Sequence, residues 1–292
     1  MKFSIGGAFE ALIKWLQNNF EPFFDAATVV IGTTTSALEG VLLFLPDWAM
    51  VLLLTALAWW VASRGVALFT LVGMGLLAEV HVTVMGTAVT VGMGYWEVTM
   101  QTLALILTAS LFSLLVGIPV GVWAAKSDLV EKGVRPILDF MQTMPPFVYL
   151  IPAVVLFGLG TVPGVIATFI FATPPCVRLT NLGIRQVSEE AVEAARSFGS
   201  TPTQLLFKVE LPMALPTILA GVNQTVMLAL SMVVIAALIG SSGLGQPVVA
   251  GLQQLRVAKG FEGGLGIVIL AIFLDRITQA AGEKAGAAPD GA

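Results

Sequence analysis

Residues 99–125, TMQTLALILTASLFSLLVGIPVGVWAA, carry no charged side chain, and this stretch decides the class of fold. A helix needs about 20 apolar residues to cross the hydrocarbon core of a bilayer. Lipid offers no hydrogen bonds to the backbone, so a run of this length is expected to be a membrane-spanning helix. The composition agrees, because 57% of the 292 residues are hydrophobic and 11% are charged, about half the charge of a typical soluble domain. We predict an all-α, polytopic integral membrane protein, a helical bundle.

Other apolar runs predict about seven spans, with six as the fallback. The first two cover residues 48–62 and 66–93, and the second of these is interrupted by Glu79 and His81. After residues 99–125 come 136–157, 162–177, 216–240 and a last span from 264 to about Asp275. Prolines in 144–146, 152 and 174–175 are expected to kink or break their helices. The tail beyond Arg276 is predicted to be disordered.

Basic residues divide unequally between the two sides of this seven-span topology. One side receives ten: Arg64, Lys126, Lys132, Arg135, Arg178, Arg185, Arg196, Lys208, Arg276 and Lys284. The other receives Lys2, Lys14, Arg256 and Lys259. The side richer in Lys and Arg faces the cytoplasm, so we expect an outside N-terminus and an inside C-terminus.

A polar stretch on the basic side, residues 188–212, predicts a helix, a glycine bend and a second helix. Ser188 suits an N-cap, and the acidic residues that follow it suit a helix N-terminus. Gly199 suits a C-terminal stop. Thr201-Pro202-Thr203-Gln204 has the pattern of a capping box with proline at the first helical position. The second helix is expected to end before Leu211-Pro212.

The spacing in this stretch points to docking of a partner. Glu193-Ala194-Ala195 is followed by Gly199 and then, after nine residues, by Val209-Glu210-Leu211-Pro212. Small alanines allow another surface to approach closely, and Glu193 can pair with Arg196 at the rim. The alternative is an ordinary interfacial hairpin of two helices.

This pattern resembles the EAA signature with which membrane subunits of ATP-binding-cassette (ABC) importers dock onto a separate ATPase. In particular, the chain resembles the permease subunit of glycine betaine/proline betaine importers, a family that also includes transporters of choline and other osmoprotectants. The stretches that carry the resemblance are 100–105, 135–143, 147–152, 178–187, 221–225 and 228–234. The sequence departs from the family in its longer 79–94 region, its proline-rich 144–146 and Val209 in place of the frequent Ile.

The resemblance implies a type I (MetI-like) importer fold in which residues 96–282 form a five-helix core with the coupling loop at 188–212. Residues 1–45 would be an amphipathic extracytoplasmic segment, 46–95 two accessory spans and 283–292 a disordered tail. The implied location is a bacterial inner membrane. The implied partners are two copies of an ABC ATPase, a second permease copy in a homodimer, and a separate extracytoplasmic binding protein. The coupling residues would be Glu193, Ala194, Ala195, Gly199, Val209, Leu211 and Pro212.

We predict no catalytic residue, no metal site and no cofactor in this chain. No Gly-Lys dipeptide occurs, so a phosphate-binding loop is excluded, and ATP and Mg²⁺ are expected in the partner ATPase. With one His and one Cys, the sequence offers no His–His or Cys–Cys pair of metal ligands. Beyond the protein partners we expect membrane lipid and no nucleic acid.

Polar residues of the span after the loop are candidates for the transport path. Asn223, Gln224, Thr225 and Ser231 either line the path or bond one helix to another. Aromatic residues at 59, 60, 95, 96, 123, 147 and 149 suit a cage for a quaternary ammonium ion, although Trp and Tyr also gather at membrane interfaces.

Two other functions fit a polytopic membrane protein. An ion-coupled osmolyte carrier or channel without an ATPase usually carries charges at mid-membrane, and residues 99–125 and 216–240 have none. A membrane scaffold without transport activity leaves the kinks and the polar face unexplained.

Overall fold

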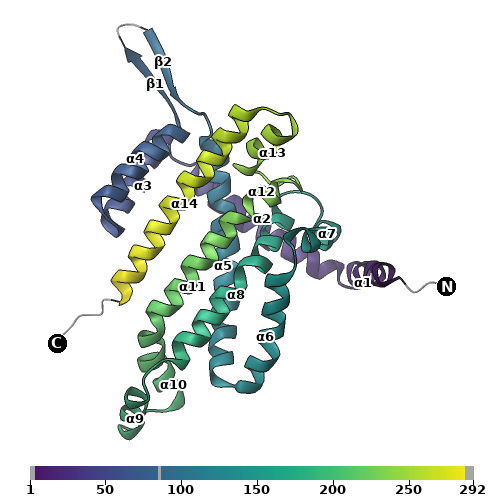
Figure 1. The fold of residues 1–292 in the computed structure, drawn as a ribbon, viewed down its shortest axis with the longest axis vertical. Helices are drawn as coiled ribbons and strands as arrows, with labels where there is room; N and C mark the ends of the chain where they lie inside the picture. The colour runs from purple at the N-terminus through teal and green to yellow at the C-terminus, as the bar shows by residue number, and fades with distance from the viewer. Residues whose placement is uncertain (1–3, 85–86, 287–292) are drawn as a thin grey trace.

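The computed structural model describes residues 4–84 and 87–286, which are nearly all helical (Figure 1). The N-terminal part contains α1 (Ile5–Asn19), α2 (Glu21–Leu42), α3 (Asp47–Val61), α4 (Arg64–Leu77), β1 (Glu79–Val84) and β2 (Thr87–Gly92). The middle contains α5 (Trp96–Lys126), α6 (Asp128–Thr143), α7 (Pro146–Phe157) and α8 (Thr161–Arg185). The C-terminal part contains α9 (Glu189–Ser197), α10 (Pro202–Leu205), the π-helix η1 (Leu206–Glu210), α11 (Leu211–Ser231), α12 (Val233–Ala237), α13 (Gly245–Gln253) and α14 (Val257–Gly286).

The described residues support four to six membrane spans, fewer than the predicted seven but including the fallback of six. Four helical stretches are long and apolar enough to cross a bilayer: α5, α8, the run from α10 to α12, and α14. Two further pairs, α2 with α3 and α6 with α7, each pass the same criteria together but bend by 97°. The α6–α7 bend follows Met144-Pro145, as the prolines there predicted. In contrast, α8 continues as one helix through Pro174 and Pro175.

The second predicted span was wrong in its latter half. α4 ends at Leu77, and the chain then forms the antiparallel hairpin β1–β2, in which Glu79 is paired with Gly92. The Val- and Thr-rich sequence of this segment favours strands over helix, because β-branched side chains pack well on a pleated sheet. α4 alone has 14 residues and reaches about 21 Å, short of the roughly 30 Å of a bilayer core.

The predicted tail was also wrong in part. α14 continues past Asp275 and Arg276 to Gly286, so residues 283–286 are helical. The charged pair does not end the helix, because Asp275 accepts hydrogen bonds from Asn223 (3.2 Å) and Gln279 (2.7 Å). Residues 287–292, the rest of the predicted tail, lie outside the described residues.

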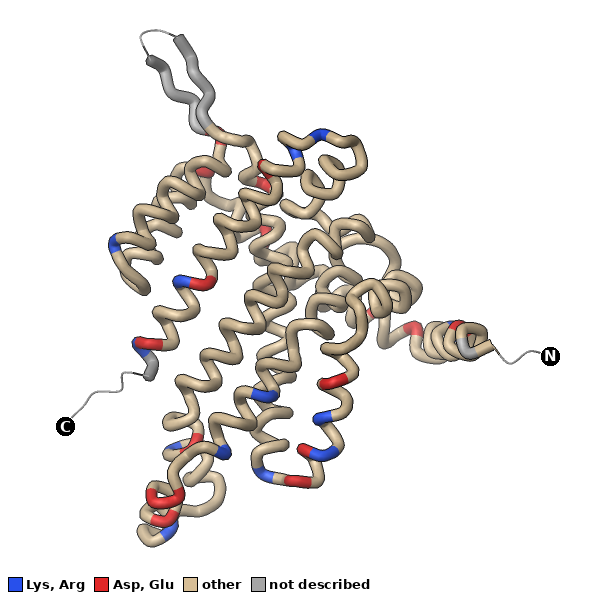
Figure 2. The backbone as a smooth tube through the Cα atoms, in the orientation of Figure 1, with Lys and Arg blue, Asp and Glu red and all other residues tan. Residues whose placement is uncertain are grey.

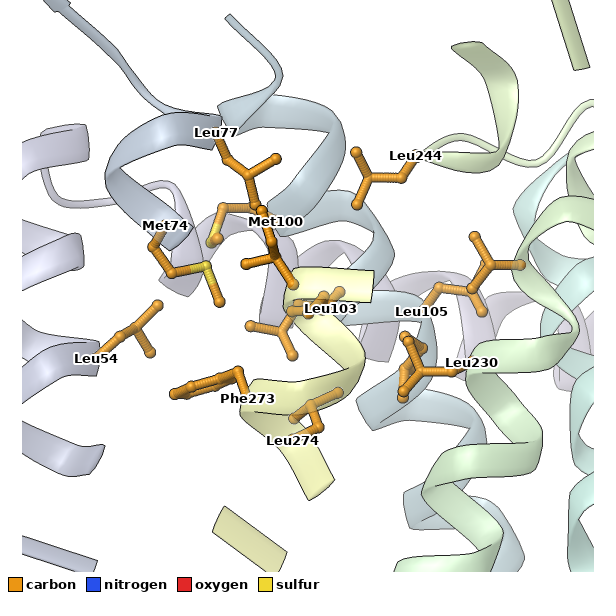
Figure 3. Packing of buried hydrophobic residues seen from close by; sticks show 14 of the residues in the cluster. Leu54, Met74, Leu77, Met100, Leu103, Leu105, Leu230, Leu244, Phe273 and Leu274 are labelled. Atoms are coloured by element: carbon orange, nitrogen blue, oxygen red, sulfur yellow. The ribbon is translucent and has the colours of Figure 1, made fainter. Parts of the chain in front are cut away.

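The main apolar core lies where α3 and α4 meet the core helices. Leu54, Met74 and Leu77 from these two helices pack with Met100 and Leu103 of α5 and with Phe273 and Leu274 of α14 (Figure 3). α3 and α4 are therefore packed against the bundle through buried side chains.

Glycines let α5 and α8 approach closely. A Cβ on Gly117 would lie 2.9 Å from Cys176 Sγ, and one on Gly121 would lie 2.6 Å from Thr180 Cβ. Gly117 and Gly121 form a G-x-x-x-G motif, which is common where membrane helices pack by van der Waals contact. The single cysteine thus has a packing position, buried in this contact.

Charged residues gather at one end of the bundle, around α6, α9 and the end of α5 (Figure 2). We call this the α9 end. The hairpin and α13 lie at the opposite end, which we call the α13 end (Figure 1).

Candidate functional site

The candidate site is the loop of residues 188–212, which projects from the α9 end of the bundle (Figure 1). It consists of α9, a bend at Gly199, and α10, which continues through η1 into α11. None of the residues of α9 is buried. A helix that buries nothing in its own chain is available to a partner.

The bend at Gly199 is a Schellman motif. The Gly199 N–H donates to the carbonyl of Arg196 (2.9 Å) and the Ser200 N–H to that of Ala195 (3.1 Å). Gly199 has a φ of +80°, a left-handed conformation that favours glycine. The predicted glycine stop is therefore confirmed. Ser188 stands at the N-cap as predicted, but its side chain makes no capping hydrogen bond.

The predicted capping box is also present at the start of α10. The Gln204 N–H donates to Thr201 Oγ1 (3.3 Å), and the Thr201 N–H donates to Gln204 Oε1 (2.9 Å). Pro202 occupies the first turn, where its missing N–H costs nothing. Together these bonds fix the direction in which the chain leaves the bend.

The second helix does not end before Leu211-Pro212, contrary to the prediction. It widens into η1, where the Leu211 N–H donates to the carbonyl of Leu206, and then continues as α11. Pro212 cannot donate to the carbonyl four residues earlier, and the wider turn before it accommodates the missing bond. Because α10, η1 and α11 form one continuous helical path, a displacement of the loop is transmitted to a membrane span.

The predicted coupling residues occupy two settings. Glu193, Ala194 and Gly199 are exposed and Ala195 is partly exposed. At the root of the loop, Val209 and Leu211 are partly buried and Pro212 is exposed. Glu193 and Arg196 form no ion pair among the described residues, so the predicted pair at the rim is absent.

Two phenylalanines give the loop an unusual surface. Phe198 is 91% exposed and Phe207 63% exposed. Beside Phe207 lies a hollow of about 690 Å³ lined by Lys126, Arg196, Ser200, Pro202, Thr203, Leu205, Leu206 and Phe207. Exposed aromatic side chains next to a hollow, in a segment rich in charges, are typical of a protein-binding surface.

A buried ion pair, which the sequence analysis missed, ties the root of the loop to α5. The Glu210 carboxylate is 7% exposed and accepts a hydrogen bond from Lys126, whose side chain is 39% exposed. These residues lie 84 positions apart in sequence. The position of Glu210 in the run Leu206-Phe207-Lys208-Val209-Glu210-Leu211, which is apolar apart from Lys208 and Glu210 itself, was the available signal that this carboxylate needs a partner.

A second cluster of charges joins α6 to α8 near the same end. Arg178 binds Asp139 (2.6 Å), and Arg185 binds both Asp128 (2.7 Å) and Glu131 (3.1 Å). The stretches 135–143 and 178–187, which were recognised separately in the sequence, are thus in contact. Each pair is partly exposed, so the cluster orients the two helices more than it stabilises them.

The candidate path residues are divided between different roles. Asn223 donates to Asp275 (3.2 Å) and accepts from Thr278, which bonds α11 to α14. Thr225 is buried and donates to the carbonyl of Gly221 in its own helix (2.9 Å). Gln224 and Ser231 are exposed. Asn223 therefore bonds one helix to another, which is one of the two predicted roles. The exposed Gln224 and Ser231 remain candidates for lining the transport path.

The aromatic residues do not form one group. Trp59, Trp60 and Trp123 are more than 60% exposed on the helix surface, whereas Trp96 and Tyr149 are buried. Outward-facing Trp side chains are typical of a membrane interface.

Known proteins resemble the chain over nearly its whole length. A family model described as "Binding-protein-dependent transport system inner membrane component" matches residues 117–283. The chain is 47% identical, over 92% of its length and 91% of the relative's, to the glycine betaine transport system permease protein OpuAB of Bacillus subtilis. It is 50% identical to the glycine betaine/carnitine transport permease protein GbuB of Listeria monocytogenes, with 91% of each chain covered.

The fold also resembles a solved structure. A chain in an inward-facing structure of the MetNI methionine ABC transporter matches with a TM-score of 0.58 and 20% identity, over 65% of this chain and 95% of that one. At this identity the likeness concerns the fold alone, and it agrees with the predicted MetI-like bundle.

Proposed function

Because the chain belongs to the family of binding-protein-dependent transport system inner membrane components, we propose that it is the permease subunit of an ATP-driven importer of betaine-type osmoprotectants. It is a multi-pass protein of the bacterial inner membrane. The observation that carries the proposal is the near full-length match to permeases named for glycine betaine and carnitine transport. Both compounds carry a quaternary ammonium group, and we assign quaternary ammonium osmoprotectants as the substrate class, with proline betaine and choline as further members.

The loop of residues 188–212 is the docking site of a separate ATPase. Its supporting features are the exposed helix α9, the glycine bend, the two exposed phenylalanines and the continuous path from α10 into α11. Glu193, Ala194, Ala195 and Gly199 form the contact surface. Val209, Leu211 and Pro212 form the root through which closure of the ATPase tilts α11, a two-state rigid-body change.

The complete transporter contains two copies of this chain, two ATPase subunits and a separate extracytoplasmic binding protein. The α9 end faces the cytoplasm, where ATP is available, with the N-terminus outside and the C-terminus inside. Residues 96–282 form the transport core, residues 1–45 an extracytoplasmic segment and residues 46–95 an accessory unit. Gln224 and Ser231 face the path, and Asn223 and Thr225 hold the helix that carries them.

The test is uptake of labelled glycine betaine by proteoliposomes that contain the permease, its ATPase and its binding protein. We expect uptake that requires ATP hydrolysis and is inhibited by unlabelled carnitine. Gly199→Asp should break the Schellman bend and Glu193→Lys the contact surface, so both should lower betaine uptake per ATP hydrolysed at unchanged permease content. Glu190→Lys, an exposed change on the same helix outside the signature, is the matched control.

The alternative, an ion-coupled carrier, predicts uptake driven by an ion gradient with the ATPase absent. Concentrative uptake by the permease alone would refute the proposal, and so would unchanged ATP-driven uptake in both loop variants.

A further inference from the structure

A pocket of about 410 Å³ lies at the base of the β1–β2 hairpin, at the α13 end of the bundle (Figure 1). It is enclosed by the turn between α2 and α3, the start of β1 and the chain that leads from β2 into the first turn of α5. Its volume falls within the roughly 300–1,000 Å³ of small-molecule sites. The lining residues are Leu43, Asp47, Glu79, Gly94, Trp96 and Glu97. We call this the acidic pocket.

Three carboxylates line the acidic pocket without a cation to neutralise them. Asp47, Glu79 and Glu97 form no ion pair among the described residues, and no Lys or Arg lines the pocket. The Glu79 carboxylate lies close to the chain that enters α5, because a Cβ on Gly94 would stand 3.7 Å from its Oε2. Three negative charges around one hollow attract a cation.

Helix termini explain only part of this arrangement. Asp47 and Glu97 stand in the first turns of α3 and α5, where the helix dipole favours an anion. Glu79 lies in β1, outside any helix, so a dipole does not account for its place beside the other two. Charge alone does not define a ligand here, and the decisive residue is Trp96.

Trp96 adds a buried hydrogen-bond donor to the wall of the pocket. The residue is 5% exposed, and its Nε1–H has no hydrogen-bond partner among the described residues. An indole N–H can only donate, and a buried donor without an acceptor costs free energy. The backbone beside it is fixed, because the N–H groups of Met93 and Tyr95 donate to the carbonyls of Leu76 (2.8 Å) and Leu77 (2.9 Å). An acceptor atom of a bound molecule would satisfy the indole.

The pocket therefore combines an anionic wall with one unsatisfied N–H donor. A metal ion does not match it, because no group of three His, Cys, Asp or Glu residues in the described part of the chain could hold one. A simple organic cation would leave the indole without an acceptor. A small zwitterion meets both requirements, since its cationic end can face the carboxylates while its anionic oxygen accepts the bond from Trp96.

We propose that the acidic pocket is an extracytoplasmic entry site for the zwitterionic substrate of the transporter. The quaternary ammonium group lies among the three carboxylates, and the substrate carboxylate accepts a hydrogen bond from Trp96 Nε1. This inference rests on the proposed function, which supplies a betaine as the zwitterion. It also gives residues 46–95 a role, because α3 and β1 must pack beside the start of α5 to form the site. Choline, which lacks the carboxylate, binds more weakly than glycine betaine.

The experiment measures binding of labelled glycine betaine and labelled choline to the permease–ATPase complex in phosphatidylglycerol nanodiscs, with no binding protein present. We expect saturable binding with a lower Kd for glycine betaine. Glu79→Gln and Asp47→Asn should each raise the Kd of both ligands about tenfold, because each removes one of the charges around the ammonium group. Glu21→Gln is the control, since it removes an exposed carboxylate of α2 outside the pocket.

Trp96→Phe tests the zwitterion directly. It removes the donor and keeps an aromatic ring, so the Kd of glycine betaine should rise about tenfold while that of choline changes by less than about twofold. A merely structural role of Trp96 would change both Kd values together. Trp48→Phe is the control, because Trp48 is 67% exposed beside Asp47 and does not line the pocket.

Four results would overturn the inference. They are no saturable binding of glycine betaine to the wild-type complex, equal wild-type Kd values for the two ligands, pocket variants that bind both ligands as the wild type does, and a parallel rise of both Kd values in Trp96→Phe. Phosphatidylethanolamine carries a similar pair of charges in its headgroup. Loss of betaine binding in nanodiscs of that lipid would assign the pocket to lipid and also overturn the inference.

The proposed function has its own separate test in ATP-driven uptake of glycine betaine by the wild-type transporter with its binding protein. Absence of that uptake would refute the proposed function, whatever the acidic pocket binds. Normal uptake together with unchanged Kd values in the pocket variants would overturn the entry site alone.

Discussion

The buried pair of Lys126 and Glu210 leads to a specific prediction, because its two members are buried to different degrees. Removal of either one breaks the only described ion pair between α5 and the root of the docking loop. The consequences should differ, since the Glu210 carboxylate is 7% exposed and the Lys126 side chain 39% exposed. We therefore expect Lys126→Met to be more damaging than Glu210→Gln.

The loss of stability in each variant depends on how well water can solvate the partner that remains. Removing one partner of a fully buried pair costs about 3–5 kcal/mol, whereas an exposed pair is worth about 0–1 kcal/mol. Lys126→Met leaves a buried carboxylate without its cation, and we discount the buried figure for the partial exposure of Lys126 to about 1–3 kcal/mol. Glu210→Gln leaves an ammonium that water reaches and an amide oxygen that still accepts its bond, so we expect less than about 1 kcal/mol.

The assay is the apparent Tm of the purified permease in nanodiscs, together with betaine uptake per ATP hydrolysed in proteoliposomes. Both quantities should fall more for Lys126→Met than for Glu210→Gln. The double exchange, Lys126→Glu with Glu210→Lys, should recover part of the loss. Lys132→Met is the control, because Lys132 is exposed and forms no ion pair among the described residues. Equal Tm values for Lys126→Met and Lys132→Met would refute the reasoning, and so would a double exchange no better than the worse single variant.

Two further predictions concern packing within the bundle and use the same Tm measurement. Gly121→Ala would place a Cβ 2.6 Å from Thr180 on the facing helix and should destabilise the fold by about 1–3 kcal/mol. Gly133→Ala, whose Cβ would meet nothing within 4 Å, should stabilise it by about 0.4–1 kcal/mol. A lower Tm for Gly133→Ala than for Gly121→Ala would contradict the close-packing argument. Thr102→Val leaves the buried N–H of Leu244 without its acceptor and should cost about 1–3 kcal/mol. Thr108→Val loses only a bond to its own helix and should be nearly neutral, so similar Tm values for the two valine variants would show that the Thr102 bond contributes little.

Local sequence signals predicted local structure well. The charge-free run 99–125 became α5, and residues 48–62 became the helix α3, which meets the criteria for a span only together with α2. Gly199 and the capping box of Thr201 and Gln204 lie where their patterns placed them. The reason is that caps, glycine stops and apolar runs act over a few residues, so their energetics are contained in the sequence itself.

Predictions failed where local sequence signals conflict, or where a residue distant in sequence determines the local structure. The run from 66 to 93 looked like one span, yet β-branched residues after Ala78 form a hairpin. The sequence predicts the end of a span near Asp275, yet Asn223 on α11 donates a hydrogen bond to this carboxylate and α14 continues past it. The helix after Pro202 was also predicted to end before Leu211-Pro212, because proline is disfavoured inside a helix. It continues instead, because the wider turn of η1 accommodates Pro212.

The sequence by itself determined that this chain is a helical membrane protein with an exposed helix–glycine–helix loop, because hydropathy and backbone capping are local properties. Only the tertiary structure decided that Glu210 pairs with Lys126, that α5 and α8 meet through glycines, and that Asp47, Glu79 and Trp96 line one pocket. Each of these depends on residues distant in sequence or on backbone geometry. Their contact energies arise only after the helices have packed.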